Sequence, residues 1–173
     1  MFKHAAVPVP TDHLIAIGKI TVNYGFLESC LKHIIWDIVG GQRLGQVITS
    51  DLTFNALIDQ ANSLFIQNYK NRHLRDELWK ILSGPVRRAQ SKRNHIAHAT
   101  WGKKGDIVKM FTVRANKKTG YSRSTVDITV NDLVEIADLI ASASQELQHF
   151  RMHRMLNEDV NPDIKNWPHR RDN

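Results

Sequence analysis

The sequence predicts a mainly α-helical protein, a bundle of four to five helices with a β-hairpin inserted before the last long helix. Three observations predict this fold. Apolar residues recur at steps of three and four over most of the chain, the step shortens to two between about residues 106 and 130, and the longer step then returns for one extended segment. Because 173 residues with 42% hydrophobic content suffice for one core, we expect a single domain, residues 1–173, with its core at about 12–155.

The first helix should begin at Thr11 or Asp12, either of which can cap it, and should end at Gly40-Gly41. Its apolar steps predict a buried stripe made of Leu14, Ile17, Thr21, Tyr24, Leu31, Ile35 and Ile38.

Two helical segments follow the glycine pair. A short one is expected across Arg43 to Ile48, and a longer one should open at Asp51 or Thr53 and fade near Tyr69.

A further helical pattern begins near Asn71 and meets "SGPV" at residues 83–86. Proline lacks an amide proton and restricts the residue before it, so we expect a break or kink here. Pro85 can then be the first residue of a new helical run that extends through Arg93, Asn94 and His98.

The hairpin is predicted from "DIVKMFTVRA" and "YSRSTVDITV", which alternate with a period near two and are joined by "NKKTG". Asn131 or Asp132 should then cap the long final helix, which is expected to end near Leu156. The polar tail at about 157–173 shows no packing period.

The position of the single cysteine and the apolar content bear on localisation. Cys30 alone can form neither an intramolecular disulfide nor a thiolate cluster, and it is most simply a core residue in a reducing cytoplasm. The first ten residues have no apolar core of signal-peptide length, and no window reaches the roughly 18 apolar residues of a membrane span. We therefore expect a soluble, cytoplasmic protein without a membrane partner.

The net charge of +7 is unevenly distributed. Between Arg87 and Arg123, eleven basic residues accompany the single acid Asp106, a local charge of +10, while the rest of the chain carries −3. Such a surface attracts polyanions by counterion release, so nucleic acid is the first partner to consider and an acidic protein the second; a solvated lysine-rich surface is the plainer alternative. The predicted nucleic-acid-binding residues are Arg87, Arg88, Lys92, Lys103, Lys104, Lys109, Arg114, Lys117, Lys118 and Arg123, those of the hairpin contributing affinity without chemistry.

The stretch "SKRNHIAHATW" at residues 91–101 places Arg93, Asn94, His95 and His98 close together. Arg93, four intervening residues and His98 match the R-x4-6-H signature of the HEPN superfamily, in which a polar residue commonly follows the arginine. The chain resembles that family over roughly residues 12–155, including "YGFLESCLKHII" in the first helix, and the hairpin looks like an elaboration.

The resemblance implies a metal-independent endoribonuclease without a cofactor. Such proteins are usually homodimers in which the two motifs meet at the subunit interface. In a microbe the resemblance also fits a toxin or phage-defence component, with an antitoxin protein as a candidate partner.

Helix geometry gives a separate reason to expect a dimer. At about 100° per residue, Asn94 and His98 share a helix face, whereas Arg93 and His98 diverge by about 140°. A two-fold axis beside the motif would bring a second Arg93 and His98 into the same cleft. The long arginine side chain could also curl around within one subunit, so this geometry favours a dimer without requiring one.

The residue types suit RNA cleavage by attack of the 2′-hydroxyl on the adjacent phosphate. The imidazole of His98 can carry the protons because histidine titrates near cellular pH, and the guanidinium of Arg93 can hold the phosphate charge. Asn94 could orient His98 or bind the sugar, and His95 is an auxiliary candidate for a second proton carrier. Glu28 is the other auxiliary candidate, because the apolar steps put it on the buried stripe and a buried carboxylate needs a partner, for which we expect Arg93 or Asn94.

Other interpretations of these residues remain. The motif could be structural, with a histidine bonded to a backbone carbonyl and Arg93 paired with Glu28. A non-catalytic helical dimer that binds nucleic acid or an acidic protein through the basic segment is the second functional hypothesis. His149 and His153 have the spacing of a metal pair, but a third ligand and the zinc-protease glutamate are missing, so we expect a solvated helix end and no metal site.

Overall fold

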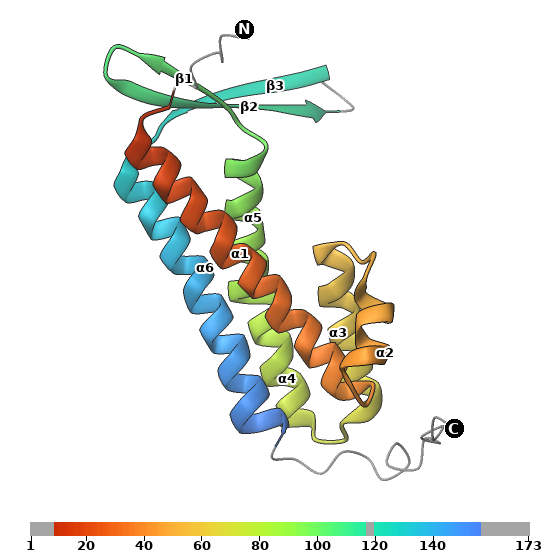
Figure 1. Ribbon diagram of the computed structural model, residues 1–173. Helices are drawn as coiled ribbons and strands as arrows, with labels where there is room; N and C mark the ends of the chain where they lie inside the picture. The colour runs from red at the N-terminus through yellow and green to blue at the C-terminus, as the bar shows by residue number, and fades with distance from the viewer. Residues whose placement is uncertain (1–8, 117–119, 157–173) are drawn as a thin grey trace, which may run out of the picture.

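The computed structural model describes residues 9–116 and 120–156. The helices are α1 (Thr11–Ile38), α2 (Gln42–Thr49), α3 (Phe54–Asn68), α4 (Arg72–Ile81), α5 (Arg87–Ala97) and α6 (Val130–Phe150), with π-helical turns η1 (Leu82–Val86) and η2 (Arg151–Met155). Strands β1 (Thr100–Lys104), β2 (Ile107–Asn116) and β3 (Gly120–Asp127) form one antiparallel sheet. The predicted mainly α fold with a β insertion before the last helix is confirmed (Figure 1).

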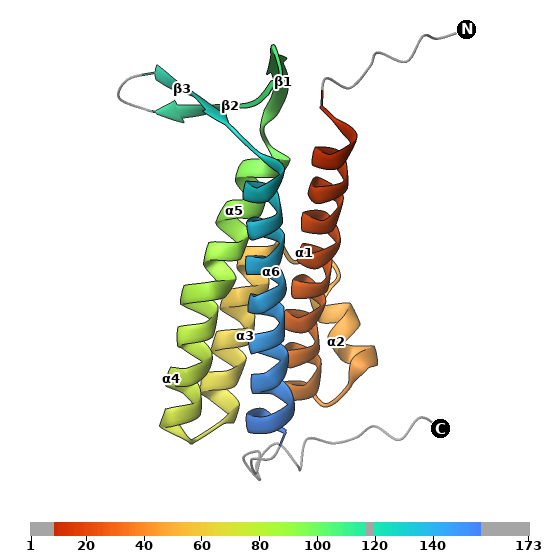
Figure 2. The same cartoon turned by 90° about the vertical axis from the view of Figure 1, so that its left-hand side faces the viewer.

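The two longest helices, α1 and α6, lie side by side and run in the same direction (Figures 1 and 2). At one end, Nε2 of His13 lies 3.2 Å from the carbonyl oxygen of Ile128. At the other end, Nε of Arg151 donates to Oδ2 of Asp37 at 2.5 Å. Because the helices are parallel, the chain must return along the bundle before α6 begins, and the segment from α4 to α5 makes that return.

The register of α1 differs from the predicted one in its first half. His13 and Ile20 face the core there, whereas Leu14 and Thr21 are exposed. From Tyr24 onward the predicted stripe positions are buried. Since this part of the helix carries apolar side chains on several sides, their spacing does not select a face, and packing against α6 does.

α1 is the one helix within the described residues that is long and apolar enough to cross a membrane, with a mean hydropathy of 1.2 over an 18-residue window. The expectation that no segment is apolar enough over about 18 residues to span a membrane is therefore wrong. In the structure, α1 packs against α2, α3, α5 and α6, and its buried side chains belong to the common hydrophobic core. This arrangement is compatible with a soluble protein.

A π-helical turn replaces the break that was predicted at Pro85. The turn η1 contains Pro85 and joins α4 to α5, so the three segments form one continuous rod (Figure 2). A regular α-helix would set the proline ring against the carbonyl four residues earlier, and a wider turn relieves that clash. The hydroxyl of Ser83 donates to the carbonyl oxygen of Trp79 at 2.6 Å within the same stretch. Pro85 therefore does not begin a new helix.

The β insertion has three strands, one more than the predicted hairpin. β2 and β3 pair as expected, with Lys109 opposite Asp127, and β1 pairs with the other edge of β2, with Thr100 opposite Phe111. Gly105, at φ +59°, makes the tight turn between β1 and β2, a backbone conformation that glycine adopts readily. The short sequence of β1, "TWGKK", lacks an alternating pattern, which is why periodicity does not reveal it.

The predicted helix caps need two corrections. α1 begins at Thr11, but its N-cap is Pro10, which makes no side-chain hydrogen bond, so neither Thr11 nor Asp12 caps this helix. Thr53 caps α3, as the sequence predicts, and Asn71, near which the next helix was expected to begin, caps α4. α6 is capped by Thr129 and not by Asn131 or Asp132, because Thr129 and Asp132 form a reciprocal capping box. The Oγ1 atom of Thr129 accepts from the backbone N–H of Asp132 at 3.2 Å, and Oδ2 of Asp132 accepts from the backbone N–H of Thr129 at 2.7 Å.

The sheet lies at one end of the bundle, beyond the C-terminal end of α5 and the N-terminal ends of α1 and α6 (Figures 1 and 2). Side chains of Met110, Thr112, Ser124 and Val126 lie on the sheet face that is turned toward α5 and α6. The chain that leaves α5 enters this sheet directly, so the motif lies where the helices and the sheet meet.

Candidate active site

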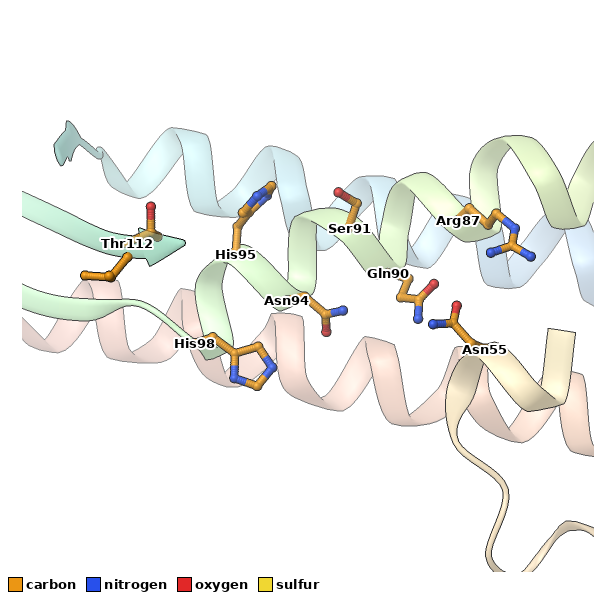
Figure 3. Close-up of a pocket in the computed structure, with 9 residues that line it drawn as sticks. Asn55, Arg87, Gln90, Ser91, Asn94, His95, His98 and Thr112 are labelled. Carbon is orange, nitrogen blue, oxygen red and sulfur yellow. The ribbon is translucent and has the colours of Figure 1, made fainter. Parts of the chain in front are cut away.

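A groove of about 490 Å³ runs along the length of α5, between the start of α3 and strand β2 (Figure 3). It is lined by polar side chains for the most part. These come from α3, α5, the turn after α5 and β2: Asn55, Arg87, Gln90, Ser91, Asn94, His95, His98, Thr112 and Val113. Asn94 and His98 project to the same side of the helix, while His95 projects to the other side (Figure 3).

Three of the motif residues therefore lie in one groove. His98 is the C-cap of α5, where its backbone N–H donates to the carbonyl oxygen of Asn94 at 3.1 Å. Its side chain is exposed, whereas those of Asn94 and His95 are partly buried. An exposed imidazole beside this amide can reach a ligand in the groove, and the two side chains share one face of α5 as helix geometry predicts.

Arg93 is directed away from this groove. Its guanidinium carbon lies 4.7 Å from the centre of the Tyr24 ring, a cation–π contact, and its NH1 donates to Oδ1 of Asn94 at 3.2 Å. The Tyr24 ring also stacks on Phe54, with 4.7 Å between the ring centres. Burial raises the pKa of the Tyr24 hydroxyl to about 12, although the nearby guanidinium acts in the opposite direction, so this tyrosine is neutral at physiological pH. Arg93 thus anchors the motif to α1 and orients Asn94.

Glu28 does not have the partner that the sequence predicts. Its Oε1 lies 2.7 Å from Nζ of Lys32, one turn along the same helix, and both side chains are partly exposed. No hydrogen bond or ion pair joins Glu28 to Arg93 or Asn94 in the described part of the chain, so the expected contact is wrong. Tyr24 and its neighbours on the core face occupy the buried positions, which leaves Glu28 at the margin of the stripe.

The charge in the groove suits an anion. Among the described residues that line it, Arg87 is the permanent cation, and its NH2 lies 3.0 Å from Oδ1 of Asp59 in an exposed ion pair. Exposed pairs of this kind contribute little to stability, so a phosphate can replace the carboxylate at small cost. The residues that line the groove include no carboxylate, and their amides and hydroxyls can bind phosphate or sugar oxygens.

The basic segment that was predicted to bind nucleic acid is spread over several elements. Asp59 and Asp127, acids outside this segment in sequence, pair with Arg87 and Lys109, which reduces the local excess of charge. Arg123 lies over the Phe111 ring at 5.3 Å. The other predicted binding residues on α5 and β1 are all exposed, and they are Arg88, Lys92, Lys103 and Lys104. One of them, Lys103, forms an ion pair with Asp106 at 3.8 Å. Lys117, Lys118 and the side chain of Arg114 lie outside the described residues.

Sequence reasoning missed part of the groove. Ser91 lies one helical turn before His95, a spacing that could have indicated it. Asn55 and Thr112 carry no local signal, because α3 and β2 reach the groove only through the tertiary fold.

The other candidate residues lie away from the groove. The rings of His149 and His153 are 4.6 Å apart, centre to centre, at the far end of the bundle. Over residues 9–116 and 120–156, no three His, Cys, Asp or Glu side chains come close enough together to hold a metal ion. Cys30 is buried, and this burial raises the pKa of its thiol.

Comparison with known proteins identifies no relative. No protein-family model matches the chain, and searches of curated proteins and of solved structures find no match. The fold and the groove are therefore the basis for any inference about function.

Proposed function

We propose that this protein is a metal-independent endoribonuclease of the HEPN type, which cleaves RNA by attack of a 2′-hydroxyl on the adjacent phosphate. The observation that supports the proposal most directly is a groove lined by His98, Asn94, His95 and Arg87, with no carboxylate among the described residues that line it. They include the proton carriers, the amide and a cation of the kinds that the reaction needs. Asn94, His95 and His98 belong to the motif that resembles the family, whereas Arg87 lies outside it.

The proton steps fall to the histidines. One imidazole takes the proton of the 2′-hydroxyl as its oxygen forms a bond to phosphorus. A protonated imidazole gives a proton to the 5′-oxygen as the bond from phosphorus to that oxygen breaks, leaving a 2′,3′-cyclic phosphate and a 5′-hydroxyl. His98 is exposed in the groove and takes one of these roles, and His95 or the His98 of a second copy takes the other. The amides beside His98 stabilise the charge that develops on the phosphoryl oxygens, and Arg87, about three turns earlier on α5, can bind another phosphate of the RNA.

A second copy of the chain would complete the site. Within one chain, Arg93 faces Tyr24 and His98 faces the groove, so the two residues of the motif do not meet on one ligand. The open face of α1 is the surface through which we propose that a second copy binds. That face exposes Leu14, Ile15, Val22 and Phe26, and no atom lies within 4 Å of a Cβ built on Gly18 or Gly25, so a partner helix can approach closely.

The biological setting proposed for such an enzyme is the cytoplasm of a microbe, where it would act as a toxin or phage-defence component. An antitoxin protein is the corresponding partner. Because the groove is cationic and its exposed histidine must remain accessible, an acidic segment of that partner could occupy it and block RNA.

A cleavage assay on mixed RNAs in excess EDTA tests the proposed function. We expect wild-type protein to cleave RNA, and we expect His98→Ala to reduce the rate at least about 100-fold, the usual contribution of a general acid or base. His149→Ala is the matched control, because this exposed histidine lies at the far end of α6 and should leave the rate unchanged. Cleavage that survives His98→Ala would place the reaction outside this groove.

The alternative function is a non-catalytic dimer that binds nucleic acid or an acidic protein. One observation favours it, namely that Arg93 is engaged with Tyr24 and Asn94 and does not line the groove. Wild-type protein that binds RNA with a strong salt dependence and leaves it intact would support this alternative.

A further inference from the structure

A second cavity, of about 330 Å³, adjoins the groove on the other side of α5. His95 and Thr112 line both spaces, so they form a shared wall between them. The cavity is bordered by α5, by the inner face of the sheet and by the first turns of α6, and it is open to solvent at its rim, where Val126 is 48% exposed. Figure 3 shows the His95 side chain on the side of α5 away from His98, the side on which this cavity lies.

The lining of this cavity combines apolar walls with a polar rim. Its apolar walls are Ile96, Met110, Val126, Ile128 and Ile136. Its polar groups are Lys92, His95, Thr112, Ser124, Asp127 and Asp132. A nucleobase has the matching form, since its two faces are apolar and its edge carries hydrogen-bonding atoms. The volume is near the low end of the range for ligand pockets, about 300–1,000 Å³, which suits one base and not a larger ligand.

We propose that this cavity binds the nucleobase next to the scissile phosphate and gives the enzyme a preference for guanine or uracil. The inference rests on the proposed ribonuclease function, because the shared wall places a base in the cavity beside a phosphate in the groove. It also goes beyond that function, since the histidine and arginine motif carries no information about the bases of the RNA.

The preference follows from the polar groups that the cavity offers. Asp127 is paired with Lys109, and Asp132 is held in the capping box with Thr129, so the two carboxylates are engaged. Lys92 can only donate hydrogen bonds, and it is exposed at the rim. A lysine selects base edges that carry carbonyl oxygens, as it does at the O6 and N7 atoms of guanine. Guanine and uracil present such oxygens, while the corresponding positions of adenine and cytosine carry amino groups.

Two hydroxyls on the inner face of the sheet provide further hydrogen-bonding groups in the cavity. Oγ1 of Thr112 and Oγ of Ser124 are 2.6 Å apart, on directly paired positions of β2 and β3. Because each hydroxyl can both donate and accept, this solvent-accessible pair can bind either a donor or an acceptor on the edge of a base. The pair also fixes Thr112, which belongs to both spaces.

Binding of single nucleotides to the full-length chain tests the subsite without relying on cleavage. The probes are the 3′-monophosphates of guanosine, uridine, adenosine and cytidine, with inorganic phosphate as a separate arm, and their dissociation constants are measured by calorimetry. We expect the guanosine and uridine nucleotides to bind at least fivefold more tightly than the other two. Equal binding of all four nucleotides and of phosphate alone would overturn the inference.

Two variants locate the site. Val126→Trp should fill the cavity from a strand position that is 48% exposed and tolerates aromatic residues, and should weaken nucleotide binding at least tenfold. Thr125→Trp is the matched control, because residue 125 is the neighbouring position on the opposite face of β3 and should bind as wild type does. Lys92→Met changes an exposed helical side chain, so it should fold normally and lose the preference between bases.

The inference and the proposed function can fail separately. Selective nucleotide binding that is lost in Val126→Trp, in a protein that leaves RNA intact, would support the subsite and contradict the ribonuclease. Cleavage of RNA without base preference, unchanged in Val126→Trp and Lys92→Met, would support the ribonuclease and contradict the subsite.

Discussion

At the scale of single residues, the motif is held by an aromatic contact and not by the expected carboxylate. The guanidinium of Arg93 lies against the Tyr24 ring. It also donates a hydrogen bond to Asn94, which fixes the orientation of that amide at the edge of the groove. A planar guanidinium can stack on a ring and donate sideways at the same time, which an ammonium group does less well. Arg93 is thus a positioning residue in one chain, while direct contact with phosphate requires a second copy.

A double-mutant cycle measures this contact. Arg93→Met and Tyr24→Leu each remove one partner, and we expect a coupling of about 0.5–1 kcal/mol in the free energy of unfolding, the usual size of a cation–π contact. Urea denaturation of the two single variants and the double variant supplies the values. Arg88→Met, on the exposed side of α5, is the control and should be additive with Tyr24→Leu. Additive effects for Arg93 as well would mean that the stacking does not stabilise the fold.

At the scale of elements, the last helix begins at a capping box that also borders the proposed nucleobase cavity. Thr129→Ala should lower the free energy of unfolding by about 1 kcal/mol, because it leaves a helix N–H without its acceptor. Thr129→Ser retains the hydroxyl and should keep wild-type stability, as thermal or urea unfolding can measure. Equal losses in both variants would show that the threonine acts through its methyl group.

The same box gives a pH dependence. The hydroxyl and backbone N–H of Thr129 donate to the Asp132 carboxylate and hold its pKa below the ordinary value of 3.8. A lowered folded-state pKa means that the stabilisation is present above the unfolded-state value and is lost as the pH falls through the folded-state value. The difference in stability between wild type and Thr129→Ala should therefore be full at pH 7 and shrink below about pH 4.

At the scale of the whole molecule, the proposed dimer requires the open face of α1. Val22 is 72% exposed on that face, and Val22→Glu should place a charge in the interface, convert the dimer to a monomer and reduce RNA cleavage. Val47, also 72% exposed but on α2, provides the control, since Val47→Glu should leave both properties unchanged. Sedimentation velocity at micromolar concentration reports the mass. A fully active wild-type monomer would contradict the dimer, as would binding of this face to lipid vesicles in place of a second copy.

The parts of the fold that could be predicted from the sequence are those set by local chemistry. Thr53 and Asn71 cap their helices through side chains that reach only two or three residues ahead, and the alternation in β2 and β3 follows from the two-residue period of a strand. The mainly helical fold with its insertion follows from these patterns.

The parts that could not be predicted depend on contacts between distant segments. The buried face of α1 is selected by α6, and β1 exists because β2 offers an edge for pairing. In the candidate site, His98 and Asn94 are four residues apart and could be placed together from helix geometry. The contact of Arg93 with Tyr24 and the position of Asn55 in the groove could not be predicted, because both depend on how distant helices pack in the folded protein.

Analysis of the termini left by cleavage tests the central claim most directly. An RNA oligonucleotide is incubated with wild-type protein in EDTA, and the products are identified by mass spectrometry beside a strand with 2′-deoxyribose at every position. If this chain is a HEPN-type ribonuclease, we expect 2′,3′-cyclic phosphate and 5′-hydroxyl termini from RNA, no product from the deoxy strand, and no product with His98→Ala. Intact RNA, or 5′-phosphate termini that require water as the attacking group, would contradict this claim.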